Sequence, residues 1–160
     1  MDFRKMIIGL STILFVTMVF GAGESPLPQE DPDGWVLAFV DVETTGLTPG
    51  YHEMIDIGVV ISTLDGREID RLFLRILPDH PERVSDGAVA VNAFDPARWK
   101  KLGALSPTQA VDSMVAFHRR AAAGRQIMMV ACNSQFDAAF IDHLFRSVNH
   151  NWRDIFYYYV

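Results

Sequence analysis

The chain has 160 residues, of which 49% are hydrophobic, and this length and composition are typical of one ordinary globular domain. It has a single cysteine, which excludes an intramolecular disulfide, and no Cys/His cluster that could form a structural zinc site. The 20 acidic and 14 basic residues give a formal charge of −6, which argues against a protein that coats nucleic acid through bulk electrostatics.

The first 34 residues are expected to precede the folded domain. Arg4 and Lys5 come before an apolar stretch at 6–20 and small residues at 21–23, the order of a secretory signal peptide. We therefore expect residues 1–23 to be cleaved and the mature protein to be secreted or periplasmic, without stable membrane association. An N-terminal membrane anchor is the alternative, although the stretch is shorter than the about 20 residues that span a bilayer. Residues 24–34, rich in Pro and acids, predict a linker to a domain at 35–160.

Three strands are predicted at the start of this domain. Residues 35–40 are six apolar residues without alternation, which predicts a central strand covered on both faces. Residues 54–62 and 68–77 also resemble strands, and the Asp65-Gly66 pair between them is typical of a hairpin turn. At least two of the three sequential strands should therefore be antiparallel.

Helices are predicted after Pro78. Asp95-Pro96 and Ser106-Pro107 each place an N-cap before a proline at the first helical position, and Gln109 completes a capping box. The second helix should end near Gly124. Residues 126–131 predict another buried strand, residues 137–148 a helix with one apolar face, and residues 156–160 an incoming strand.

Acidic residues stand at the end of the first predicted strand. Asp41 and Glu43 are two residues apart, so they share a strand face with Leu37 and Phe39, which we expect to pack inward. Two like-charged carboxylates at the edge of a core lose hydration and repel each other. Divalent cations would compensate, because carboxylate oxygens suit Mg²⁺ or Mn²⁺. The alternative is a solvated strand end that holds no metal.

A third acid, Asp137, follows the strand at 126–131. Ser134 could cap the next helix, and Asp137 would then be the acid three residues on that interacts with the helix dipole. Helix capping and metal binding are compatible roles, since a carboxylate of the first turn can face the same cleft.

The segments VDVETTGL (40–47) and NSQFD (133–137), each after a predicted buried strand, resemble the DEDD (DnaQ-like) superfamily of 3′-to-5′ exonucleases. The resemblance extends over 35–160, with a smaller match in EMIDIG at 53–58. It implies a ribonuclease H-like α/β fold, in which three sequential antiparallel strands are followed by helices and a further central strand in one mixed sheet.

The resemblance also implies the roles of individual residues. Asp41, Glu43 and Asp137 would be three of four acidic catalytic residues that bind two Mg²⁺ or Mn²⁺ ions. The residues implied to contact the 3′-terminal nucleotide are Thr44 through a backbone N–H, Leu47 as an apolar wedge, Phe136 beneath it, and Asn92, where many relatives have a histidine.

One motif of the resembled family is missing. Relatives have a fourth Asp, preceded by a His or Tyr general base, several dozen residues after the second motif, whereas 23 residues follow Asp137 here. His150 and Asp154 come too soon after the predicted helix to reach the strand ends. We therefore expect the C-terminal part of the domain to be missing and the chain as given to be inactive or weakly active.

The implied reaction is phosphodiester hydrolysis by two metal ions, which releases nucleoside 5′-monophosphates from a single-stranded 3′ end of DNA or RNA. The acidic composition favours short or single-stranded substrates, because few phosphates can be neutralised away from the site. A non-catalytic nucleic-acid or protein-binding module with the same fold is the alternative. No pattern in the sequence specifies an oligomeric state.

The remaining polar and aromatic residues have structural interpretations. Arg71 and Arg75 share a strand face and are expected to be exposed on an edge strand, although they could touch a nucleic-acid backbone. Cys132 is expected to be a buried thiol. We expect surface positions for His52, His80, His118 and His143, and packing roles for Trp99 and Trp152.

Overall fold

The computed structural model describes residues 26–159, so the predicted signal peptide lies outside the described residues. Its core is a five-stranded sheet in the order β3-β2-β1-β4-β5. β2 is antiparallel to both β1 and β3, whereas β4 pairs in parallel with β1, and β5 with β4. The predicted mixed sheet with β1 at its centre is therefore confirmed. The strands are β1 (Trp35–Thr44), β2 (Met54–Ser62), β3 (Glu68–Arg75), β4 (Gln126–Val130) and β5 (Tyr158–Tyr159).

Within residues 26–159, four α-helices and two short 3₁₀ turns connect the strands, and a third 3₁₀ turn precedes β1. The helices are α1 (Asp86–Asn92), α2 (Pro96–Lys101), α3 (Pro107–Ala122) and α4 (Ser134–Ser147). The 3₁₀ turns are η1 (Pro32–Gly34), η2 (Pro81–Arg83) and η3 (Trp152–Asp154). Among the described residues, no helix is long and apolar enough to cross a bilayer.

The local signals for turns and caps are mostly confirmed. Gly66 in the β2–β3 hairpin has φ of 89°, which glycine adopts without strain. Asp95 caps α2, and Ser106 and Gln109 form both bonds of the capping box of α3. The N-cap of α4 is Asn133 rather than the predicted Ser134, which is already helical.

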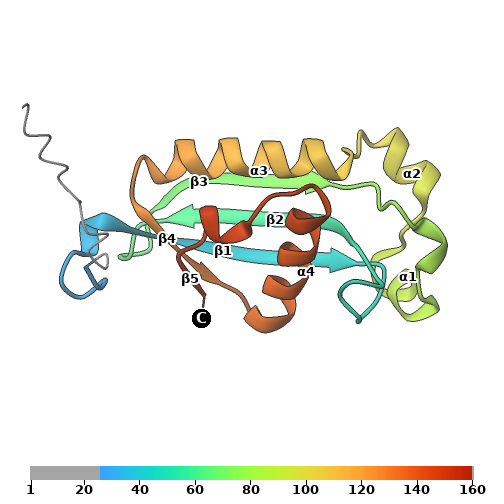
Figure 1. Ribbon diagram of the computed structural model, residues 1–160, viewed down its shortest axis with the longest axis horizontal. Helices are drawn as coiled ribbons and strands as arrows, with labels where there is room; N and C mark the ends of the chain where they lie inside the picture. Colours follow the sequence, from blue (N-terminus) through green and yellow to red (C-terminus); the bar gives the residue numbers. More distant parts are fainter. Residues whose placement is uncertain (1–25, 160) are drawn as a thin grey trace, which may run out of the picture.

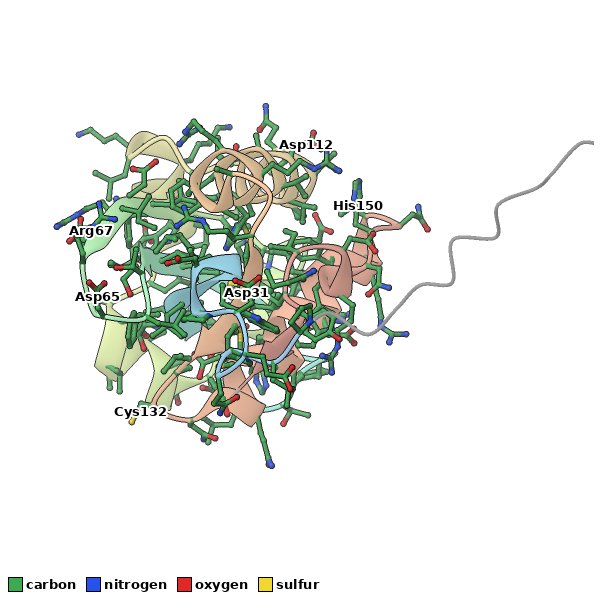
Figure 2. The ribbon with its side chains drawn as sticks, turned by 90° about the vertical axis from the view of Figure 1, so that its left-hand side faces the viewer. Asp31, Asp65, Arg67, Asp112, Cys132 and His150 are labelled. Carbon is green, nitrogen blue, oxygen red and sulfur yellow. The ribbon has the colours of Figure 1, made fainter. Side chains whose placement is uncertain are left out.

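The two long helices cover the same face of the sheet. Alternate residues of β1 at 36, 38, 40 and 42 are buried in one core with side chains of α3 and α4, including Phe117 and Phe140. On the opposite face, Phe39 is 45% exposed and Leu37 is half-buried. Seen along the strands, α3 lies above the sheet and Cys132 points outward below it (Figure 2). The expectation that β1 is covered on both faces, with Leu37 and Phe39 packed inward, is therefore wrong.

The strand order explains why this face stays open. β3, β1, β4 and β5 run in the same direction, and α3 and α4 make the crossovers β3–β4 and β4–β5. Both crossovers move the chain toward the same edge of the sheet. Right-handed connections in the same direction place their helices on the same side.

The helices α1 and α2 lie at the end of the sheet where β1 finishes (Figure 1). Trp99 of α2 and Phe94 pack there against Ile55 of β2 in a second, smaller core. At the other end of β1, the Trp35 ring is buried and its Nε1 donates to the carbonyl oxygen of Pro26 at 2.9 Å. The two ends of the otherwise open face are thus covered by different segments of the chain.

Two polar residues lie in environments opposite to those predicted. Cys132 is exposed rather than buried, because β4 ends at Val130 and the following loop leaves the core. His118 is only 1% exposed, because the inward side of α3 carries it into the core. Trp99 and Trp152 are buried packing residues, as predicted.

Candidate metal and nucleic-acid site

The first two predicted acids lie on the open face of β1, near the end of the strand. Asp41 is exposed and pairs across the strands with Gly58, while Glu43 is half-buried and pairs with Asp56. The register shifts between Glu43 and Thr44, so the regular ladder ends directly after the acids. β1 therefore presents both carboxylates on the open face of the sheet, near the end of the strand.

The third acid, Asp137, comes to the same place from α4. It lies in the first turn of this helix and is only 5% exposed. Burial is the main cause that raises the pKa of Asp137, and the negative charge of Asp41 raises it further, while backbone hydrogen bonds at Asp137 itself and at Val42 lower it. The structure thus brings Asp41 and Asp137 together from segments almost 100 residues apart in the chain.

The chemistry of these donors fits a divalent cation. Asp41 and Asp137 are neighbouring carboxylates whose negative charges repel each other. Carboxylate oxygens are the ligands that Mg²⁺ and Mn²⁺ prefer. Within residues 26–159, no group of three or more Asp, Glu, His or Cys side chains is arranged to hold a metal ion. Among the described residues, the site therefore consists of the pair Asp41 and Asp137. Glu43 lies two residues after Asp41 on the same face of β1.

A further acid lies next to Glu43. Asp56 of β2 is the cross-strand neighbour of Glu43, and Arg75 of β3 follows in the same row. Burial raises the pKa of Asp56, a hydrogen bond from Trp99 and the charge of Arg75 lower it, and the charge of Glu43 raises it. Sequence reasoning did not single out Asp56, although it stands in the EMIDIG segment.

The turn after β1 is held by hydrogen bonds in and around its threonines. Thr44 Oγ1 donates to the carbonyl oxygen of Gly46 at 2.7 Å, and the Glu53 N–H donates to Thr45 Oγ1 at 2.9 Å. A Cβ on Gly46 would meet the ring of His52, so a larger residue there would have to displace that ring. Leu47 projects from this turn with 81% of its surface exposed, a position suited to the predicted wedge.

Asn92 and Phe136 both contact neighbouring parts of the protein. Asn92 Nδ2 donates to the carbonyl oxygen of Thr44 at 2.9 Å, and Asn92 Oδ1 accepts from the Phe94 N–H at 3.1 Å. The Asn92 amide thus ties the end of α1 to the end of β1. Phe136 is half-buried, and its ring centroid lies 4.8 Å from that of Phe140.

The strand order, the direction of each strand and the acids at the end of β1 and the start of α4 define a ribonuclease H-like fold with a candidate site at the end of its central strand. The family model described as Exonuclease matches residues 38–158. The chain belongs to this family, and the family and the fold together support a nuclease function.

Solved structures show the same fold at low sequence identity. E. coli exonuclease I in complex with a dA16 oligonucleotide is similar with a TM-score of 0.63 and 13% identity over 74% of this chain and 25% of that chain. The same enzyme with a dT13 oligonucleotide gives a TM-score of 0.62 and 13% identity over 72% of this chain and 24% of that chain. The matched region is about a quarter of the exonuclease I chain. No curated protein sequence matches this chain significantly.

Proposed function

We propose that this chain is the domain of a metal-dependent 3′-to-5′ exonuclease that releases nucleoside 5′-monophosphates from single-stranded or short nucleic acids. The observation that carries the proposal is the convergence of Asp41 and the buried Asp137 on one end of the sheet. Burying one carboxylate beside another costs several kcal/mol unless a positive charge compensates. Metal-dependent phosphodiester hydrolysis uses such a site.

Different residues of the chain would bind the metal and the substrate. A divalent cation held by Asp41, Glu43 and Asp137 would polarise the scissile phosphodiester and lower the pKa of the attacking water. Leu47, on its hydrogen-bonded turn, would contact the terminal base. The Thr44 backbone N–H and Phe136 would position the terminal nucleotide. The Asn92 bond to the Thr44 carbonyl would hold that part of the site in place.

The proposal is tested with a 5′-labelled single-stranded oligonucleotide in Mg²⁺ or Mn²⁺. The full-length gene product should shorten it from the 3′ end and release 5′-monophosphates. Asp41→Asn and Asp137→Asn should each reduce the rate at least about 100-fold, because each removes a charged metal ligand. Asp142→Asn is the matched control, since Asp142 lies on α4 but pairs with Arg146 at 2.7 Å. Undiminished hydrolysis by Asp41→Asn would refute the proposal.

A non-catalytic nucleic-acid-binding module is the second candidate. The observation in its favour is that the described residues bring two acids together rather than a larger metal-binding group. Such a module would bind the oligonucleotide without shortening it in either metal. Its affinity would be unaffected by Asp137→Asn.

We also propose that residues 1–23 are a signal peptide and that the protein is exported. N-terminal sequencing of the exported protein should find Glu24 as its first residue. An uncleaved protein in the membrane fraction would favour the N-terminal anchor instead.

A further inference from the structure

A groove of about 650 Å³ crosses the open face of the sheet beside the candidate site. It extends from Asp41 on β1, across Gly58 on β2, to Phe73 on β3. The groove is therefore continuous with the acids proposed to bind metal. Its lining consists of Phe39, Val40, Asp41, Gly58, Val59, Val60, Arg71, Leu72, Phe73, Val130, Ala131 and Cys132.

Two exposed aromatic rings and a glycine shape the groove. Phe39 is 45% and Phe73 54% exposed, which is unusual for side chains on a sheet face. Gly58 is the cross-strand neighbour of both Asp41 and Phe73, and a Cβ on it would meet no heavy atom within 4 Å. The absent side chain at Gly58 leaves a hollow between the acid and the aromatic ring.

An arginine held by aromatic rings lies beside this hollow. The Arg75 guanidinium carbon is 4.8 Å from the centroid of the Phe73 ring and 5.8 Å from that of Trp99. Its Nε is buried and has no hydrogen-bond partner among the described residues. Among the described residues, its two terminal nitrogens form no hydrogen bond either.

Arg71, which lines the groove two residues earlier on β3, differs in this respect. Arg71 forms a bidentate pair with Glu68, with both bonds at 2.8 Å. No ion pair found within residues 26–159 includes Arg75. Arg75 thus combines a fixed position with a positive charge that faces the Asp56 carboxylate across the strands without forming an ion pair.

We propose that this groove binds the single-stranded nucleic acid behind its terminal nucleotide, with a base on Phe39 or Phe73 and a backbone phosphate on Arg75. The inference rests on the proposed function and names a path for its substrate. Bases stack on exposed aromatic rings whatever their identity, and a braced guanidinium binds phosphate through two donors.

The dimensions and the charge favour this occupant. Neighbouring strands are about 4.8 Å apart, so β1 and β3 are about 10 Å apart, which leaves room for a base over Gly58, between Asp41 and Phe73. The groove is continuous with Asp41, and the Arg75 guanidinium over the Phe73 ring adds a positive charge that forms no ion pair within residues 26–159.

The test measures binding rather than hydrolysis, by fluorescence anisotropy of a labelled oligo-dT in Ca²⁺. Gly58→Val fills the hollow with a side chain whose Cβ meets no heavy atom within 4 Å, and Arg75→Gln removes the proposed phosphate contact. Each should weaken binding about tenfold, and Arg75→Gln should also reduce the slope of log affinity against log salt by about 0.7. Arg120→Gln is the control for loss of charge, because Arg120 lies on α3 and pairs with Asp70 at 3.2 Å.

The single cysteine supplies a second measurement, which does not depend on substitutions in the groove. Cys132 is exposed on the rim of the groove, so a bulky maleimide should react with it. Oligo-dT should slow this reaction at least about fivefold, whereas thymidine monophosphate, which fills only the terminal position, should not.

Three outcomes would overturn the proposal. If the wild-type chain binds and hydrolyses the oligonucleotide but Gly58→Val and Arg75→Gln bind equally well, the groove is refuted and the proposed function stands. If the wild type does not bind the oligonucleotide, both are refuted. If Gly58→Val abolishes a dimer in sedimentation analysis and leaves oligonucleotide binding unchanged, the groove takes a second copy of the chain instead.

Discussion

The buried imidazole of His118 predicts a loss of stability in mild acid. Its Nδ1 donates to the carbonyl oxygen of Met114 at 2.7 Å, and its Nε2 is buried without a partner among residues 26–159. The ring packs edge-on against Phe156 with the centroids 4.9 Å apart. Burial in these apolar surroundings lowers the pKa of His118 from 6.5 to about 4, with the Met114 bond opposing it.

The sign and size of the effect follow from these two pKa values. The unfolded chain takes up the proton near pH 6.5 and the folded chain only near pH 4, so protons favour unfolding between them. The stabilisation is complete above pH 6.5 and is lost as the pH falls toward 4. Since one pKa unit is worth about 1.4 kcal/mol, the loss is about 3 kcal/mol.

Urea unfolding at pH 7 and pH 4 measures this loss. Between pH 7 and pH 4, the free energy of unfolding should decrease by about 3 kcal/mol more in the wild type than in His118→Phe, because phenylalanine cannot take up a proton. His150→Gln is the control, since it replaces an exposed histidine that forms no ion pair within residues 26–159. An equal loss in His118→Phe and the wild type would refute the reasoning.

Further predictions concern the turn after β1 and the metal. Asn92→Ala removes the bond to the Thr44 carbonyl, so it should lower the free energy of unfolding by about 1–2 kcal/mol and slow hydrolysis; a stable variant with full activity would contradict this. Gly46→Ala pushes a Cβ against His52, so it should cost about 1–3 kcal/mol in thermal unfolding, and an unchanged melting temperature would show that the turn adapts. Chelation of divalent cations should stop nucleotide release and added Mg²⁺ should restore it, whereas hydrolysis that persists in chelator would exclude the proposed metal chemistry.

Much of the backbone could be predicted because its signals are local. The bounds of β2 and the start of α3 agree with the pattern, since hairpin and capping preferences depend on residues three or four positions apart. The helix α1 was not separately predicted, because its seven residues carry little periodic signal. The start of α4 was misplaced by one residue, since Asn133 and Ser134 are both acceptable caps.

The candidate site was predicted in part. The motifs around Asp41 and Asp137 indicated that these acids belong to one site, and the structure brings them together. Asn92 was predicted to bind the nucleotide, but its amide is engaged by Thr44 and Phe94, partners that no sequence spacing reveals. Asp56 enters the site through its strand register with Glu43, which depends on how β1 and β2 pair.

The order of strands, their hairpin, the helix caps and the motif acids can all be read along the chain, because each depends on neighbouring residues or on a recognisable family pattern. Which face of the sheet is covered cannot be read in this way. Six apolar residues in β1 are compatible with two covered faces, but both crossovers run in the same direction and place α3 and α4 on one side. Phe39 and Cys132 are therefore exposed and His118 is buried, and the open groove beside Asp41 exists because of this handedness.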